Sequence, residues 1–296
     1  MIYQSGDAFR QALGSRLLAK SRQDEIPLSW LRKMVAFDRF LARLVEDRPE
    51  DWLLKGGMAL QLRLGMAART TKDLDLLMAE DEPDIQEELV RAALLELEDW
   101  FRFTVRQPSR STDGDWGISR RFHVSALVAG RSFENFHVDV GMDEPIVGVP
   151  EPFSMLPLLE FAGIKSATIL CYPIVQQIAD KVHAYTRPRP AGISTRVKDV
   201  IDILLIARIQ TFQRTSLHSA LEATFSYYNT HPLPMILPDP PVSWMTQFRQ
   251  LARTTDLAYT TPAEAVDAMR SLVEPALQGA GNEHWNPLTW SWESLP

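Results

Sequence analysis

The sequence predicts an α/β (α+β) protein in which a mixed sheet is followed by a largely helical C-terminal part. Segments 101–107, 117–130 and 134–141 alternate apolar and polar side chains, as half-buried strands do. From residue 173 onward the apolar spacing is helical, over 173–186, 195–210, 214–228 and 261–277. A proline-rich segment, "EPIVGVPEPFSMLP" (144–157), separates the two patterns. These observations predict two domains, 1–155 and 156–296.

Two amphipathic helices are expected before the sheet. The first covers about residues 7–20, and the second runs from Ser29, a good N-cap residue, to about Val45. A short strand "DWLLKGG", a helical segment "MALQLRLG" and a strand "KDLDLLMA" follow, and then a helix over 82–100 with Pro83 in its first turn. The tail after residue 278 contains three tryptophans, so we expect it to pack against the protein.

The composition is that of an ordinary soluble globular protein. Of its 296 residues 45% are hydrophobic and 23% charged, and no apolar stretch reaches the roughly 18 residues that span a bilayer. We find no signal peptide. The single Cys171 excludes an internal disulfide, and its apolar neighbours favour a buried hydrophobe over a nucleophile. We therefore expect a cytoplasmic protein without a membrane partner.

The stretch "RTTKDLDLLM" (69–78) raises the central question about function. Side chains alternate along a strand, so Asp73 and Asp75 point to one face while Leu74 and Leu76 point to the other. Two carboxylates on one face of a core strand are costly unless a cation or hydrogen-bond donors compensate them. Mg²⁺ binds one or two carboxylates together with substrate phosphates, so the pair predicts a metal site. The alternative is a sheet edge whose acids face water.

Two neighbouring motifs support the metal site. "KGGM" (55–58) stands between a predicted strand and a predicted helix, where free backbone N–H groups can hold an anion. "FHVDVG" contributes Asp139 from another strand, which would complete a two-metal site able to activate a hydroxyl and hold a triphosphate. Taken singly, the glycine pair can be a tight turn and Asp139 a surface acid.

The helical part carries a second group of charges. Lys181 lies in an amphipathic helix, and Asp199 and Asp202 are three residues apart on one face of the next helix. Between 181 and 198 the chain is basic and lacks acids, through Lys181, Arg187, Arg189, Arg196 and Lys198. A surface ion-pair cluster is one interpretation. The other is a phosphate-contacting lysine steered by an aspartate, beside a surface for a polyanion.

In combination these motifs resemble the AbiEii/AbiGii-type nucleotidyltransferase toxins, which include the MenT-like toxins of toxin–antitoxin systems. The resemblance runs in order through "LLKGGMAL", "RTTKDLDL", "HVDVG", "IADKVHAYTR" and "TRVKDVIDI". It implies a polymerase-β-like nucleotidyltransferase core followed by a helical domain that completes the active site. It also implies transfer of a nucleotide from an NTP, with Mg²⁺ or Mn²⁺, to RNA, most typically the 3′ end of tRNA, and a block of translation.

Position by position, the resemblance assigns roles to particular residues. Asp73 and Asp75 match the metal-binding pair, Lys181 the phosphate-contacting lysine, and Asp202 the last acid of an RxKDxxD-like motif. Asp139 fits the third acid, and the basic residues Arg187, Arg189, Arg196 and Lys198 would take the RNA backbone. Nucleotide binding would involve Lys55, Gly56 and Gly57. Met58 departs from the superfamily, which commonly has serine there, so phosphate binding would rely on backbone amides.

The resemblance also implies a partner and a regulatory site. A cognate antitoxin is expected, for which a kinase-like protein is one form. Thr71 holds the position, two residues before the first metal aspartate, at which such an antitoxin phosphorylates MenT-like toxins. Two other functions stay open at this point: transfer to a small molecule or a protein hydroxyl, and a catalytically idle binding scaffold. The net charge of −7 favours a small acceptor over RNA, whereas the clustered arginines favour RNA.

Overall fold

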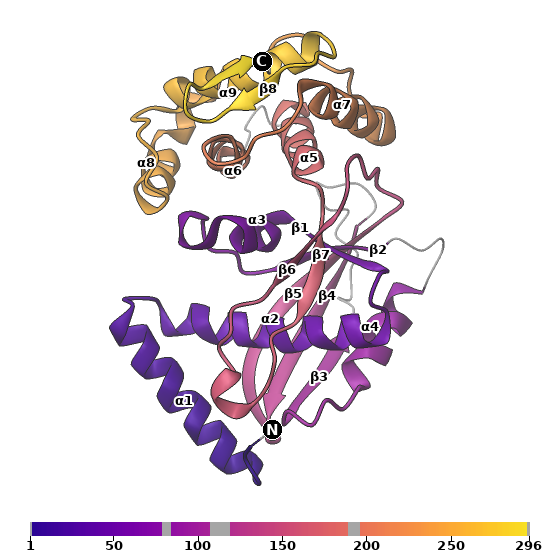
Figure 1. The fold of residues 1–296 in the computed structure, drawn as a ribbon, viewed down its shortest axis with the longest axis vertical. Coiled ribbons are helices and arrows are strands. Elements are labelled where there is room, and N and C mark those ends of the chain that lie inside the picture. The colour runs from indigo at the N-terminus through magenta and orange to yellow at the C-terminus, as the bar shows by residue number, and fades with distance from the viewer. Residues whose placement is uncertain (1, 79–83, 107–118, 189–195, 295–296) are drawn as a thin grey trace.

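The computed structural model describes residues 2–78, 84–106, 119–188 and 196–294, and in these the chain forms a mixed sheet with helices at two sides (Figure 1). Seven strands of the described chain make the sheet, in the order β3-β4-β5-β2-β1-β7-β6. They are β1 (Trp52–Lys55), β2 (Leu74–Met78), β3 (Phe101–Arg106), β4 (Ser119–Val128), β5 (Arg131–Met142), β6 (Glu151–Ser154) and β7 (Thr168–Cys171). Strand β2 runs parallel to β5 and β1 runs parallel to β7, and the other neighbours are antiparallel.

One face of the sheet is covered by α1 (Gly6–Gln23) and α2 (Leu28–Asp47), and α2 lies across the strands in Figure 1. Apolar residues of both helices pack with alternate strand residues, among them Leu74, Leu76, Val138 and Val140, in one buried cluster. The short α4 (Ile85–Leu94) packs beside α2 and β3. Because side chains alternate along a strand, the residues between these apolar positions point to the opposite face.

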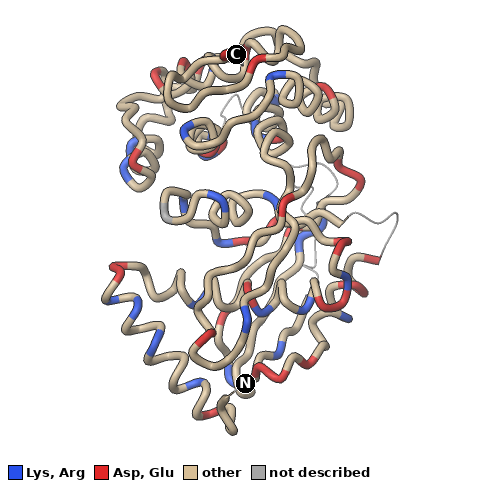
Figure 2. The backbone as a smooth tube through the Cα atoms, in the orientation of Figure 1, with Lys and Arg blue, Asp and Glu red and all other residues tan. Residues whose placement is uncertain are grey.

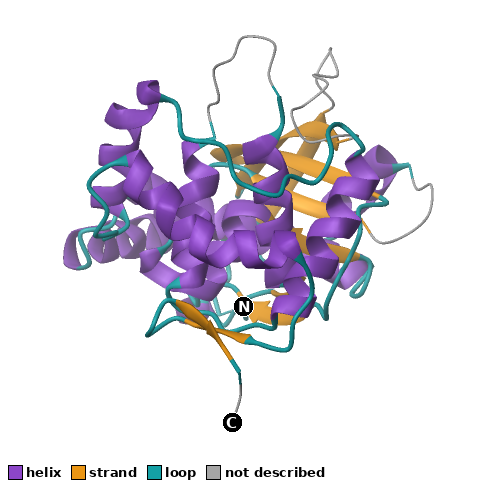
Figure 3. Ribbon diagram, turned by 90° about the horizontal axis from the view of Figure 1, so that it is seen from above, coloured by secondary structure: helices purple, strands orange, loops and turns teal. Residues whose placement is uncertain are grey.

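A group of helices stands over that opposite face. It comprises α5 (Ile174–Thr186), α6 (Val197–Ala207), α7 (Arg214–Tyr228), α8 (Met245–Thr254) and α9 (Pro262–Gln278). A second buried cluster joins these helices and takes in Leu60 and Leu64 of α3 (Gly56–Leu64), which therefore lies between the sheet and the helical group. The view from above in Figure 3 shows the helices massed over the strands.

The C-terminal tail forms a small hairpin, β8 (His284–Asn286) and β9 (Ser291–Glu293), that packs on the helical group. Trp285 is fully buried, and its indole Nε1 donates a hydrogen bond to the carbonyl of Ala207 at 2.7 Å. Trp290 and Trp292 donate to carbonyls of α9 at 3.1 and 3.0 Å. The expected packing of the tryptophan-rich tail is confirmed.

The sequence-based elements are confirmed except at particular boundaries. Ser29 is not the N-cap: α2 begins at Leu28, after Pro27, without a side-chain cap. The helix expected to reach residue 100 ends at Leu94, and Asp84 caps its N-terminus, while Pro83 lies outside the described residues. The strands β6 and β7 and the helix α8 were not expected. The two strands have four residues each, whereas α8 has apolar residues at helical spacing, Phe248, Leu251 and Ala252, that were overlooked.

The domain division stays a prediction. Buried residues between Met155 and Cys171 belong to the cluster around the sheet, whereas Leu60 and Leu64 belong to the helical cluster. None of the described helices is both long enough and apolar enough to cross a membrane.

Candidate active site

The register of four neighbouring strands places four charged residues in one row across the sheet. Lys55 of β1 is paired with Asp75 of β2, Asp75 with Asp139 of β5, and Asp139 with Arg121 of β4. Paired residues project to the same face, here the one turned away from α1 and α2. Arg121 donates two hydrogen bonds to Asp139, of 2.7 and 2.6 Å. The row therefore reads cation, anion, anion, cation.

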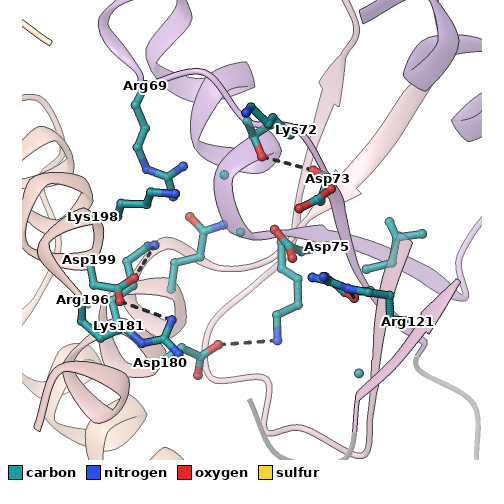
Figure 4. A pocket seen from close by; sticks show the side chains of 18 of the residues that line it. Arg69, Lys72, Asp73, Asp75, Arg121, Asp180, Lys181, Arg196, Lys198 and Asp199 are labelled. Carbon is teal, nitrogen blue, oxygen red and sulfur yellow. Dashed lines mark hydrogen bonds and ion pairs between the residues drawn. The ribbon is translucent and has the colours of Figure 1, made fainter. Parts of the chain in front are cut away.

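Asp73 lies directly before β2 and beside this row. Its carboxylate is 3.5 Å from Nδ1 of His137, two residues before Asp139 on β5. Asp73 and Asp75 face the same side in Figure 4, as strand alternation predicts. The side chain of Asp73 is 38% exposed, whereas burial is the main cause of a raised pKa at Asp75. The two carboxylates thus lie at the mouth and on the floor of one site.

Asp75 is short of compensating charge. Burial raises the pKa of its carboxyl group to about 6, and the neighbouring Asp139 carboxylate adds to the rise, while Lys55 opposes it. A carboxylate that is buried beside another carboxylate favours protonation unless a further cation is present. A further cation in the site would therefore stabilise the ionised form of Asp75.

Lys55 cannot supply that charge alone, because it is shared with two other acids. Its Nζ contacts the carboxylate of Glu144 and lies 3.8 Å from that of Asp180 on α5. Burial raises the pKa of Asp180 to about 7, against the effect of Lys55 and with a further rise from Glu144. Lys55 therefore fixes the floor of the site and connects β1 to α5.

The two glycines after Lys55 are required by what packs on them. Gly56 has φ +62°, and a Cβ there would stand 1.9 Å from Oδ2 of Asp75. A Cβ on Gly57 would stand 3.0 Å from Oγ1 of Thr71. Helix α3 begins at Gly56, so its first backbone N–H groups emerge beside these residues. The glycine pair lets a helix N-terminus, suited to an anion, approach the aspartates.

The helical group supplies the other wall. Nζ of Lys181 on α5 lies 2.7 Å from Asp202 and 3.4 Å from Asp199, both on α6. Asp202 is 1% exposed and Lys181 5%, so a surface ion-pair cluster is the wrong description of these residues. Burial would raise the pKa of Asp202, but Lys181 and Arg69 outweigh burial and lower it. Burial would lower the pKa of Lys181, but Asp202 and Asp199 raise it. The network is ionised.

A cavity of about 360 Å³ lies between these two walls (Figure 4). It is lined by the carboxylates of the sheet, the start of α3, Thr71 and the cations of the helical group. Arg196 and Lys198 line it, and Arg187 ends α5 at the C-cap position. Asp202 does not line it, and Arg189 lies outside the described residues. Acidic and basic positions are interspersed along the described backbone in Figure 2.

Among the residues of the site, Arg69, Arg121, Glu144, Gln177 and Asp180 were not assigned to it from the sequence. Arg69 opens the "RTTKDLDLLM" stretch, and Gln177 lies one helical turn before Lys181, so both were within reach of the spacing argument. Gln177 is buried, and neither atom of its amide finds a partner among the described residues. Arg121 could be recognised only from the strand register, which the sequence does not give.

The carboxylates of Asp73, Asp75 and Asp139 suit a divalent cation, but that of Asp139 is already bound by Arg121. Carboxylate oxygens are hard ligands of the kind Mg²⁺ and Mn²⁺ take, and the raised pKa of Asp75 marks a place for positive charge. Within the described part of the chain, no three His, Cys, Asp or Glu side chains are already gathered as a ligand set. Asp139 is instead engaged by Arg121, whose guanidinium donates to both of its carboxylate oxygens. An ion that takes Asp139 as a ligand must compete with that guanidinium or share the carboxylate with it.

Asp75→Asn is expected to stabilise the protein above pH 6. The folded pKa of Asp75 lies above its ordinary value of 3.8, so stability is lost as pH rises from about 4 through about 6. An amide avoids that loss, which is on the order of 3 kcal/mol at pH 8 because one pKa unit equals about 1.4 kcal/mol. Urea unfolding from pH 5 to 8 measures it. The difference between variant and parent should shrink as the pH falls. A variant less stable than its parent at pH 8 would show that the carboxylate is a structural hydrogen-bond acceptor.

Comparisons with known proteins identify the family of this chain and proteins of similar fold. The family described as "Nucleotidyl transferase AbiEii toxin, Type IV TA system" matches residues 39–281. MenT4, a nucleotidyltransferase toxin of Mycobacterium tuberculosis H37Rv, shares 17% identity over 91% of this chain and 98% of its own, with a TM-score of 0.55. That likeness is one of fold. A putative nucleotidyltransferase from H. pylori matches at 14% identity, over 83% of this chain and 95% of its own, with a TM-score of 0.42.

JHP933 from Helicobacter pylori matches at 16% identity, over 81% of this chain and 90% of its own, with a TM-score of 0.40. A comparison with curated proteins found no match. The family match covers most of the chain, including both walls of the cavity. The chain belongs to the AbiEii family of nucleotidyltransferase toxins of type IV toxin–antitoxin systems.

Proposed function

We propose that this protein transfers a nucleotide from an NTP to RNA, with the 3′ end of tRNA as acceptor, and so blocks translation. One observation carries the proposal. The cavity sets three carboxylates, Asp73, Asp75 and Asp139, beside a helix N-terminus and opposite the buried cation Lys181, and the carboxylate of Asp75 is short of compensating charge. Anionic groups on one side and phosphate-binding groups on the other are what a metal–nucleotide complex requires.

In this proposal one set of residues binds the metal and another binds the phosphates. Asp73, Asp75 and Asp139 would hold Mg²⁺ or Mn²⁺, whose chemistry when bound is to neutralise phosphate charge and acidify a coordinated hydroxyl. The N–H groups of α3 and Lys181 bind the β- and γ-phosphates. Asp139 takes the proton of the attacking RNA hydroxyl. The hydroxyl oxygen bonds to the α-phosphorus as the bond to the β-phosphate oxygen breaks, and pyrophosphate leaves.

Nucleotide transfer to total RNA from each of the four labelled NTPs tests this activity. Asp73→Asn should abolish transfer, and Lys181→Ala should lower it by about 10²–10³-fold, the cost of losing one preorganised charge contact. Glu96→Gln is the matched control, because Glu96 is an exposed acid outside the cavity. Circular dichroism confirms that each variant is folded. A parent that labels no RNA with any NTP, or an Asp73→Asn protein as active as the parent, contradicts the proposal.

The choice of RNA over a small acceptor rests on basic residues of the helical group. Lys198 is exposed and lines the cavity, Arg196 lines it, and Arg187 is half-buried at the end of α5. A polyanion that contacts them releases bound counterions, so its affinity falls steeply with salt. The net charge of −7 is the observation that favours a small cationic acceptor, which has no such counterions to release.

Replacing Arg187 and Lys198 together with alanine should weaken RNA binding and lower its salt slope by roughly one unit per lost phosphate contact. Binding of the NTP should change little. Fluorescence anisotropy with labelled tRNA at several salt concentrations measures both quantities. Arg102→Ala removes one charge from a position outside the cavity and is the control. An unchanged slope in the double variant would place the acceptor elsewhere, and a flat slope in the parent would favour the small acceptor.

Thr71 is the proposed site of control by the antitoxin. Its hydroxyl donates to the carbonyl of Asp73 at 3.2 Å and faces the start of α3 from within the cavity. A phosphate on it would bring about −1.5 to −2 charge to the position proposed for the triphosphate. Modification of Thr71 would therefore exclude the NTP.

Thr71→Val is expected to keep much of the transfer activity and to resist silencing by the antitoxin, whereas Thr71→Glu should be inactive. Mass spectrometry of the parent co-expressed with the product of the adjacent gene should find phosphate on Thr71. Equal silencing of the Thr71→Val protein and the parent would show that the antitoxin acts by another route, such as occlusion of the cavity.

A further inference from the structure

Arg69 is a second cation of the cavity, and its position is fixed from behind. It lies in the segment between the 3₁₀ turn Gly65–Ala67 and β2. Its Nε and Nη2 donate to the two carboxylate oxygens of Asp202, at 2.9 and 2.8 Å. This is the two-point geometry in which guanidinium and carboxylate groups fix each other's orientation. Arg69 is thereby held by α6, although it comes from the sheet side of the chain.

The same carboxylate also holds Lys181. Oδ2 of Asp202 accepts from Nζ of Lys181 at 2.7 Å and from Nη2 of Arg69 at 2.8 Å. Since Asp202 is 1% exposed and does not line the cavity, it cannot touch a ligand there. Both cations that it holds do line the cavity. Asp202 is therefore a positioning residue that fixes two cations at one wall.

The remaining nitrogen of Arg69 faces the start of α3. Nη1 takes no part in the bonds to Asp202, and it lies 3.7 Å from where a Cβ on Gly57 would be. The next residue, Met58, is 1% exposed and has no hydroxyl to offer. At this point the first N–H groups of α3 and the Arg69 guanidinium converge from two directions. Two sets of hydrogen-bond donors, one of them carried by a cation, form a place for a phosphate group.

We infer that Arg69 binds the terminal phosphates of the NTP, supplying the side-chain donor that Met58 lacks, with Asp202 positioning Arg69 and Lys181 together. The inference rests on the proposed function, in which the cavity takes an NTP. It has a consequence that a purely structural ion pair lacks. Loss of Arg69 must weaken the binding of a nucleotide more strongly the more phosphates that nucleotide carries.

Dissociation constants of an NTP, its NDP and its NMP, measured by titration calorimetry with the full chain and Mg²⁺, test this inference. Arg69→Ala should weaken NTP binding by about 10- to 100-fold, the scale of a charge-assisted hydrogen bond, and leave NMP binding unchanged. Arg69→Lys keeps a charge for Asp202 but loses the fork, so it should fall between parent and alanine. Arg102→Ala, an exposed arginine outside the cavity, should bind all three nucleotides like the parent.

A cycle with Asp202→Asn tests the positioning role. Asp202→Asn should also weaken the NTP selectively, and the double variant should lose less than the product of the two single effects, because both changes act through one contact. Equal weakening of NTP, NDP and NMP in Arg69→Ala, or an NTP affinity like the parent's, overturns the inference while the proposed function stands. A parent that binds none of the three nucleotides removes the proposed function and this inference together. Arg69→Gln replaces Arg69→Ala if the alanine variant fails to fold.

Discussion

The site depends on the register that aligns Asp75 with Asp139 between two parallel strands. Because the two side chains are directly paired, they must project to the same face, and neither can turn away without loss of the ladder. A cation at each end of the row, Lys55 and Arg121, partly offsets the repulsion between the two carboxylates. The compensation is incomplete, since Lys55 is shared with Glu144 and Asp180 and the pKa of Asp75 remains raised to about 6.

The helical group completes the site through a second constraint, the buried carboxylate of Asp202. It ties Lys181 on α5 to Arg69 on the segment that leads into β2. Breaking a buried ion pair by removing one partner is costly, so these residues are held in place relative to one another. Lys55 makes a further link from β1 to Asp180 on α5. The two walls of the cavity are therefore connected by charged groups, and all of these except Asp202 also line the cavity.

Much of this could be predicted from the sequence, because the relevant information is local. Alternation along 73–75 gives the common face of the two aspartates, and the order of strand, glycine pair and helix at 52–64 gives the helix N-terminus. Helical spacing gives the shared face of Asp199 and Asp202. The family match supports the identification of these motifs, although the roles of the individual residues stay predictions.

What could not be predicted depends on contacts between distant segments. The partner of Asp139 follows from the pairing of β4 with β5, and that of Asp202 from the packing of the 65–73 segment on α6. Neither contact leaves a periodic pattern of residues in the sequence from which it could be predicted. Strand β6 lies inside the proline-rich segment 144–157 that was interpreted as a boundary, and β7 has four residues, too few for alternation alone to identify a strand. The close approach of Asp75 to Gly56 likewise appears only in three dimensions, although the glycine pair indicated that something approaches there.

A structure of the protein with Mg²⁺ and a non-hydrolysable NTP analogue tests the central claim most directly. We expect a triphosphate between the start of α3 and Lys181, the ion on Asp73 and Asp75, and Arg121 displaced from Asp139. A nucleotide bound outside this cavity, or a bound nucleotide with the row of Lys55, Asp75, Asp139 and Arg121 unchanged and no ion on the aspartates, would contradict it.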